Sequence, residues 1–419
     1  MPSSYSKALD FIELWRFEAQ VANGAPFNAL KDLDALTADM IFAAALGIER
    51  NESNIVNHLD YLKTAHLPKA TGEQPKGLYA FPDPKEDELL KSIQTLGLAL
   101  GQAAEAPSQR LYWFASKFRP KIRSAQARRR QILQSYIDRA ASRVRLVGSE
   151  DRMLAAVDYM VARELSSAEK EGRAPVMDSE YFHDMLYGYL LGGQDTTHSV
   201  MSFLIKRLGA HQATQAALRR HIREAHQVAH EESRNPTREE VLKAQVPYLD
   251  AFIEEVLRCN TPSPVIIKEA TSDMLILGSI VPKGTQLFFP LWGPSINEPA
   301  SAVSEEKRSE SCKKHLATPA DWMGSGYPPK EFHVERWLKR NESTREVEFD
   351  SKAGPFLTFS LGNRECWGKR LAYLQLRLLT TLIVWNFEFL PLPAGLYEEE
   401  IVDVLNAKPK TCLVRLKSL

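Results

Sequence analysis

The chain has 419 residues, of which 44% are hydrophobic, and its 53 basic side chains equal its 53 acidic ones in number. This indicates a globular protein with ample core and argues against a nucleic-acid binder. The four cysteines, Cys259, Cys312, Cys366 and Cys412, are scattered without a C-x-x-C pair, which argues against a disulfide framework and against structural zinc. With no uncharged stretch near the length of a membrane span and no signal-type run after Met1, we expect a soluble or at most peripheral chain.

The N-terminal region is predicted to be helical. Apolar spacing favours helices over residues 11–24 and 29–47, each ended by a glycine, and a third helix from 87 to about 104. Between them, residues 51–86 contain four prolines and are expected to form a loop with at most one short helix. Adjacent Trp15 and Arg16 are expected on the surface of the first helix.

A basic run, Lys117 to Arg130, opens a long amphipathic helix that continues to about residue 147. Such a run is usually a solvated helix face. The alternative is a surface that contacts membrane headgroups or an electron-donating reductase, to which exposed cations contribute.

Residues 178–208 predict a long helix that begins at Asp178 or Ser179 and is apolar nearly all round, so we expect it to be buried. Its centre contains Gly192 and Gly193, followed by Asp195 and the threonines at 196 and 197. A glycine pair in a helix interior costs up to about 2 kcal/mol relative to alanine. A costly defect in a buried helix indicates a functional site.

The next predicted helix, 247–259, carries Glu255 and Arg258 three residues apart, on one face. On its own this E-x-x-R spacing is a weak signal, because surface pairs of this kind are common. Residues 265–290 predict short strands with hairpin turns, and two further strand-like runs lie within 387–419. We expect the polar, charged residues 297–329 to form a surface insertion.

The most informative stretch is FSLGNRECWGKRLA, residues 359–372. Cys366 lies just before a predicted helix from Leu371 to Trp385, where the unpaired N–H groups and the helix dipole favour a thiolate, as does nearby Arg364. Gly362 and Gly368 flank the cysteine and permit a sharp turn or close approach to a flat cofactor. A thiolate in such a loop is a metal-ligand candidate.

Phe359, Gly362, Arg364, Cys366 and Gly368 match the haem-ligand loop of the cytochrome P450 family, which the chain resembles from about residue 11 to its end. The resemblance implies a mainly α fold with small β-sheets (α+β) and a single P450 domain over 1–419. It also implies that the family's membrane anchor, first strands and early helices are missing from this chain. By the same match, Cys366 is the axial ligand of haem iron and Phe359 shields its sulfur.

Further residues receive roles from the resemblance. Asp195 and Thr196 match the acid–alcohol pair that relays protons to oxygen, and Gly192 and Gly193 match the oxygen-binding groove. Lys268 stands where many members have an arginine that binds a haem propionate. The structural triad is implied to consist of Glu255, Arg258 and, from the FHVERW stretch at 332–337, Arg336.

The function implied is that of a haem-thiolate monooxygenase with haem b, which inserts one atom of O2 into a small organic substrate with electrons from NADPH-cytochrome P450 reductase. KEGRAPV at 170–176 and the helix after it resemble filamentous-fungal members of secondary metabolism, and a full-length parent is expected on the cytoplasmic side of the endoplasmic reticulum. The alternative is a truncated, non-catalytic relic or gene-model fragment that cannot hold haem. A member that rearranges peroxides without O2 is disfavoured, because Asp195 and Thr196 are both present.

Overall fold

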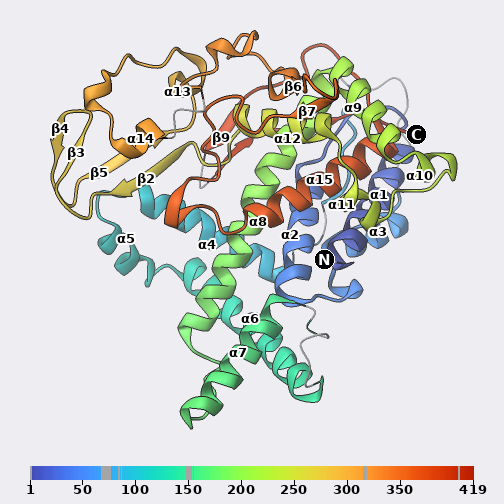
Figure 1. The fold of residues 1–419 in the computed structure, drawn as a ribbon. Helices are drawn as coiled ribbons and strands as arrows, with labels where there is room; N and C mark the ends of the chain where they lie inside the picture. Colours follow the sequence, from blue (N-terminus) through green and yellow to red (C-terminus); the bar gives the residue numbers. More distant parts are fainter. Residues whose placement is uncertain are drawn as a thin grey trace. The chain divides into compact units, whose positions relative to one another are not determined.

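The structure is a computed structural model that describes residues 2–67, 77–83, 85, 87–147, 153, 155–314, 319–403 and 406–419 (Figure 1). It is mainly helical with short antiparallel strand pairs, which confirms the predicted α+β class. The chain forms two compact units. Unit 1 comprises Met1–Ser202, Asn386–Leu405 and Pro409–Leu419, and unit 2 comprises Phe203–Trp385 and Asn406–Lys408.

Unit 1 is built from helices, with short strands near its ends. The helices are α1 (Pro2–Ala22), α2 (Leu30–Leu46), α3 (Asn54–Thr64), α4 (Glu88–Glu105), α5 (Gln109–Ser116), α6 (Pro120–Val147), α7 (Ala156–Glu171) and most of α8 (Glu180–Ala210). The strands are β1 (Phe27–Asn28), β8 (Phe387–Phe389), β9 (Ile401–Asp403), β11 (Leu413–Val414) and β12 (Leu416–Ser418). Antiparallel pairing of β1 with β11 ties the chain's last residues to the segment between α1 and α2.

Helices α1, α2 and α3 pack against one another and are the blue helices of Figure 1. Helix α2 ends as predicted at Gly47, whose φ of 70° is a left-handed conformation that glycine adopts without strain. Trp15 is fully buried against Phe387 and Phe389, so the surface position expected for it is wrong. The burial of apolar side chains determines which side of α1 points into the core.

Helix α8 is continuous over 31 residues and is the long green helix of Figure 1. It begins as predicted, because the Ser179 hydroxyl accepts a hydrogen bond from the Phe182 N–H at 3.2 Å. Tyr181 and Met185 in its first turns are exposed, so the expected burial of the whole helix is wrong there. Every residue of the helix is buried only from Thr197 to Ile205.

Unit 2 contains the rest of the helices and the hairpins. Its helices are α9 (Gln212–Ala225), α10 (Gln227–Glu231), α11 (Arg238–Lys243), α12 (Pro247–Cys259), α13 (Pro294–Asn297), α14 (Glu310–Lys314) and α15 (Lys369–Asn386). Its strands are β2 (Val265–Glu269), β3 (Met274–Ile276), β4 (Ser279–Val281), β5 (Gln286–Pro290), β6 (Leu338–Arg340), β7 (Val347–Phe349) and β10 (Ala407–Pro409). The predicted hairpins over 265–290 are confirmed: β2 pairs with β5 and β3 with β4, both antiparallel.

Helix α12 is the core helix of unit 2 and has the predicted bounds, with Pro247 at its first turn. It packs against α9, against the 3₁₀ turn Val334–Trp337 and against β6 and β7. Arg377 of α15 donates to the Asp250 carboxylate and to the Ala244 carbonyl, which ties α15 to α11 and α12. This places the helix that follows the cysteine motif on the core of unit 2.

Helix α3 is the one short helix allowed for within 51–86, and part of that segment lies outside the described residues. The helices that were not predicted are α5 and α7 and the short α11, α13 and α14. Helices α5 and α7 each begin after a stretch rich in polar residues or proline, where the spacing of apolar residues did not predict a helix. Within the segment predicted as a surface insertion, Trp322 is fully buried and packs on Trp337 with ring centroids 4.8 Å apart. No helix in the described residues has both the length and the apolar character to cross a membrane.

Candidate haem-thiolate site

The cysteine loop, residues 357–369, folds as a set of local turns before α15. The Cys366 N–H donates to the Phe359 carbonyl at 2.8 Å, and the Lys369 N–H donates to the Cys366 carbonyl at 3.3 Å. Gly362 adopts φ 75°, which a residue with a side chain reaches only with strain. Backbone bonds thus fix the position of the cysteine, which lies three residues before the first residue of α15.

Side chains of the cysteine loop attach it to α12 and α15 in unit 2. The Thr358 hydroxyl donates to the Leu257 carbonyl of α12 at 3.3 Å. The rings of Phe359 and Tyr373 lie 5.1 Å apart, and the Tyr373 hydroxyl donates to Glu254 at 2.6 Å. Burial raises the pKa of Glu254 to about 7, against the opposing effects of the Tyr373 hydrogen bond and the charge of Lys369. Sequence reasoning missed Glu254, which only its position next to Glu255 could have indicated.

The features of the cysteine loop fit a flat apolar cofactor. Cys366 is in no disulfide and is exposed, and its neighbours Leu361 and Trp367 are 65% and 88% exposed. A Cβ added at Gly362 would meet nothing within 4 Å, and one at Gly368 would meet only the Cys366 sulfur at 3.8 Å. The space beside the two glycines is therefore open, and the loop presents two exposed apolar side chains. Arg364 is exposed in the same loop.

The structure brings Glu255, Arg258 and Arg336 together in what we call the arginine network. Arg258 donates to both oxygens of Glu255, at 2.7 and 2.9 Å, and Arg336 donates at 3.0 Å. All three side chains are buried. Burial lowers the pKa of Arg258, but the hydrogen bond and charge of Glu255 outweigh it, so that pKa is raised overall.

The arginine network also fixes the chain around it. Both arginines donate to main-chain carbonyls, which are those of Pro328, Pro329 and Glu331. The Trp337 indole N–H and the His333 main-chain N–H both donate to Glu255, at 2.9 and 2.8 Å. Every charge of the network therefore has several partners, and the segment before the FHVERW stretch is attached to α12.

In unit 1, the predicted relay residues lie in the middle of α8. The Thr196 hydroxyl donates to the Gly192 carbonyl one turn earlier, at 2.6 Å, and both Asp195 and Thr196 are half-buried. Gly192 has open space, since a Cβ there would meet nothing within 4 Å. At Gly193, a Cβ would lie 2.3 Å from the Ile41 side chain of α2, so this glycine permits close helix packing.

Asp34 of α2 is a neighbour of the α8 motif that the sequence did not reveal. It accepts hydrogen bonds from Gln194 of α8 at 2.5 Å and from Gln94 of α4 at 2.6 Å, and the Nδ1 of His198 lies 3.4 Å from it. These contacts hold the centre of α8 next to α2. His198 is buried among them.

Lys268 lies half-buried in β2, opposite Leu287 of β5.

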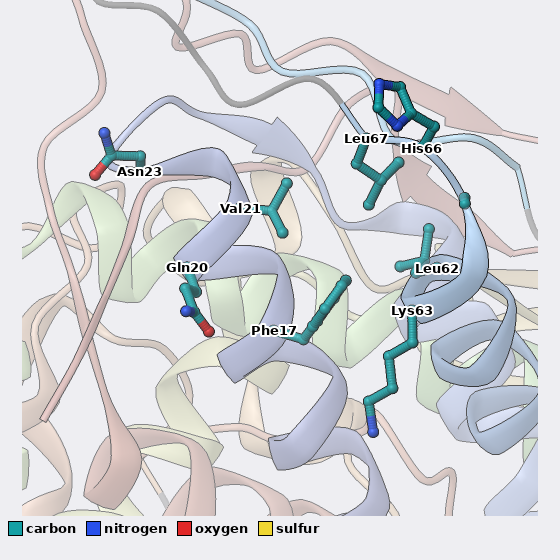
Figure 2. Close-up of a pocket in the computed structure, with 9 residues that line it drawn as sticks. Phe17, Gln20, Val21, Asn23, Leu62, Lys63, His66 and Leu67 are labelled. Atoms are coloured by element: carbon teal, nitrogen blue, oxygen red, sulfur yellow. The ribbon is translucent and has the colours of Figure 1, made fainter.

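A pocket of about 490 Å³ opens in unit 1 between the end of α1 and the end of α3, lined by Phe17, Gln20, Val21, Asn23, Leu62, Lys63, Ala65, His66 and Leu67 (Figure 2). No residue of the cysteine loop or of the α8 motif lines this pocket, so it is not the predicted oxygen-binding groove.

Comparison with known proteins identifies the class that this loop and this fold define. A family model described as "Cytochrome P450" matches residues 7–298 and 327–411. The chain therefore belongs to the cytochrome P450 family, the haem-thiolate class of monooxygenases, and is an oxidoreductase. The match leaves out residues 299–326, which lie inside the predicted surface insertion.

Two fungal relatives match over nearly the whole chain. The chain is 30% identical to the cytochrome P450 monooxygenase TRI13 of Fusarium sporotrichioides, over 99% of this chain and 73% of that protein. It is 32% identical to the cytochrome P450 monooxygenase xilC of Penicillium rubens, over all of this chain and 71% of that protein. Among solved structures, a cytochrome P450DA haem domain matches with a TM-score of 0.67 over all of this chain and 74% of its own, and its 17% identity supports the fold alone.

Proposed function

We propose that the chain inserts one atom of O2 into a small apolar organic substrate, with Cys366 as the axial ligand of haem b. The observation that carries the proposal is the cysteine loop, because its backbone bonds present an exposed thiol, bound in no disulfide, between two unhindered glycines. When bound, haem supplies the one-electron and O2 chemistry that amino-acid side chains lack.

The cysteine loop holds the cofactor from one side. With haem bound, the Cys366 thiolate would ligate the iron and donate electron density to it, and Phe359, packed on Tyr373, would help to shield the sulfur from water. Arg364 and Lys268 supply the positive charge that the two haem propionates require. Lys268 offers a point charge where a guanidinium would offer a bidentate fork, so its contribution is the smaller.

Asp195 and Thr196 deliver protons for the reduction of O2. The hydrogen of the Thr196 hydroxyl is directed to the Gly192 carbonyl, which leaves the oxygen's lone pairs to accept a hydrogen bond from a proton donor. Gly192 leaves open space beside this hydroxyl for oxygen. A positioned carboxylate and hydroxyl can pass protons to the oxygen without bulk water entering the site.

The proposed electron donor is NADPH-cytochrome P450 reductase, at the cytoplasmic side of the endoplasmic reticulum. The solvent-exposed cations of α6, among them Lys121 and Arg123, offer a surface that attracts an acidic partner. The relatives named above motivate a secondary metabolite as substrate.

The test is the carbon monoxide difference spectrum of the reduced, purified chain supplied with haem. We expect the red-shifted Soret band of a thiolate-ligated haem, lost in Cys366→Ala and kept in the control Cys412→Ala, which alters a cysteine buried in unit 1. A haem-free wild type that is folded and soluble would overturn the proposal. It would favour the second candidate, a non-catalytic relic that cannot hold haem.

The relay is tested separately in the haem-loaded enzyme. Asp195→Ala or Thr196→Ala is expected to keep the thiolate spectrum while slowing product formation about 10²–10⁴-fold or diverting oxygen to peroxide, since a positioned proton donor contributes roughly that factor. Thr197→Ala, one residue further along α8, is the matched control. Unchanged coupling of oxygen consumption to product in both variants would exclude the relay.

A further inference from the structure

Three ionisable side chains meet in the interior of the α1–α3 packing in unit 1, away from every motif that the proposed function uses. They are Glu18 of α1, Asp32 in the first turn of α2 and His58 of α3, which we call the carboxylate–histidine cluster. One potential ligand atom from each lies within 4.8 Å of the other two. The exposed fractions are 0%, 4% and 3%, so no part of the cluster is at the surface.

The cluster lacks the partners that buried charges usually have. Within the described residues, neither carboxylate oxygen of Glu18 and neither ring nitrogen of His58 makes a hydrogen bond of standard distance and angle. The Asp32 carboxyl group lies close enough to Glu18, and the Pro82 main chain close enough to His58, to shift their pKa values. The closest approach to an ion pair is the 3.7 Å between the His58 Nδ1 and the Asp32 Oδ1, and no described lysine or arginine pairs with either carboxylate. Buried charges without partners are strongly destabilising, so the cluster requires either a bound cation or protons that neutralise its carboxylates.

Burial has the expected effects on these groups. It raises the pKa of Asp32 to about 7, against the opposing effects of the Glu18 and Trp15 side chains, and it raises the pKa of Glu18, with the charge of Asp32 acting in the same direction. It lowers the pKa of His58, which favours the neutral imidazole that binds metals.

We propose that Glu18, Asp32 and His58 bind a structural divalent metal ion, zinc by preference. Two carboxylates and a neutral imidazole around a 2+ ion make an assembly with no net charge, which suits a buried position. Zinc binds imidazole nitrogen and carboxylate oxygen at about 2.0–2.2 Å, so its ligand atoms lie roughly 3–4 Å apart. The ligand atoms of the cluster lie within 4.8 Å of one another, so they need to move closer together by about 1 Å to bind the ion.

The ligand types favour zinc over other ions. Calcium and magnesium take oxygen ligands almost entirely, and an imidazole argues against them. Among first-row ions, zinc binds such a site more tightly than manganese or iron(II). The spacing of the cysteines indicated that they do not bind structural zinc. That spacing gives no information on a site made of carboxylates and a histidine from three helices.

The experiment measures metal in the haem-loaded full chain. The protein is treated with a chelator, incubated with zinc sulfate and passed through gel filtration, and zinc is counted by mass spectrometry separately from haem iron. We expect about one zinc per chain in the wild type and a loss of at least about 80% of it in Glu18→Gln and in His58→Gln. The control His226→Gln, which replaces a buried histidine between α9 and α10 of unit 2, is expected to retain the zinc.

A second measurement keeps the proposal testable if the variants do not fold. Zinc added to the chelator-treated wild type is expected to raise its melting temperature by several degrees, and renewed chelation is expected to reverse the change. Equal zinc content in the wild type and the variants would overturn the proposal. The proposal would also be overturned if the wild type retained no zinc and its melting temperature did not respond to zinc. Glu18 and Asp32 would then share a proton instead of binding a metal ion.

Discussion

Two buried charged clusters in this protein differ in how completely their atoms are bonded. In the arginine network of unit 2, Glu255 accepts hydrogen bonds from Arg258, Arg336, Trp337 and the His333 main chain. In the carboxylate–histidine cluster of unit 1, Glu18 is equally buried and accepts none within the described residues. Burial alone therefore does not reveal the role of a charge. A fully bonded cluster stabilises the fold by itself, whereas an incompletely bonded one requires a ligand or a proton.

The largest expected effect separates the two glutamates. Glu255→Gln is expected to lower the free energy of unfolding by about 3–5 kcal/mol, because both buried arginines lose their charge partner. Glu18→Gln in chelator-treated protein is expected to change it by less than about 1 kcal/mol, since Glu18 loses no hydrogen bond. Urea denaturation monitored by circular dichroism measures both.

A matched control for this contrast is the pair Glu305–Arg308, which has the same residue types and the same spacing but an exposed glutamate. Glu305→Gln is expected to cost at most about 1 kcal/mol. If Glu18→Gln were as costly as Glu255→Gln in the absence of metal, Glu18 would have a structural partner of its own, and the distinction between the clusters would fail.

Glu254 is an intermediate case, since its Oε1 accepts from Tyr373 while its Oε2 has no partner in the described residues. Its pKa, about 7, is raised above the ordinary 4.5, so the stability that its protonated form contributes is complete below about pH 4.5 and is lost as the pH rises through 7. Glu254→Gln is therefore expected to gain about 2–3 kcal/mol relative to the wild type between pH 5 and pH 8.

Denaturation of both proteins at the two pH values measures this gain. The exposed Glu306 provides the control, because its replacement by glutamine is expected to leave the pH dependence as in the wild type. A difference between Glu254→Gln and the wild type that does not vary with pH would show that Glu254 is already charged at pH 5.

The smallest effect concerns the glycine pair of α8. The Ile41 side chain occupies the space beside Gly193, whereas the space beside Gly192 is empty. Gly193→Ala is expected to cost about 1–2 kcal/mol, because its Cβ would overlap the Ile41 side chain. Gly192→Ala is expected to gain about 0.5–1 kcal/mol through helix propensity, since its Cβ meets nothing within 4 Å. Thermal unfolding of the two variants gives both values, and equal shifts would contradict the packing role of Gly193.

Several features of the protein follow from sequence alone because they are local. The ends of α2 and α12, the start of α8 and the hairpins over 265–290 were predicted, since capping residues, glycines and proline act within a few residues. The cysteine motif was also readable, because its turns and its thiol lie within one short segment.

Contacts between distant segments were decided only by the tertiary structure. Arg336 lies 81 residues from Glu255, and only the family resemblance, not spacing, suggested that they meet. No pattern in the sequence connects Glu18, Asp32 and His58, because their meeting depends on which faces of three helices pack together. Local rules fix where each helix begins and ends, whereas the burial of apolar surface fixes which side chains face one another.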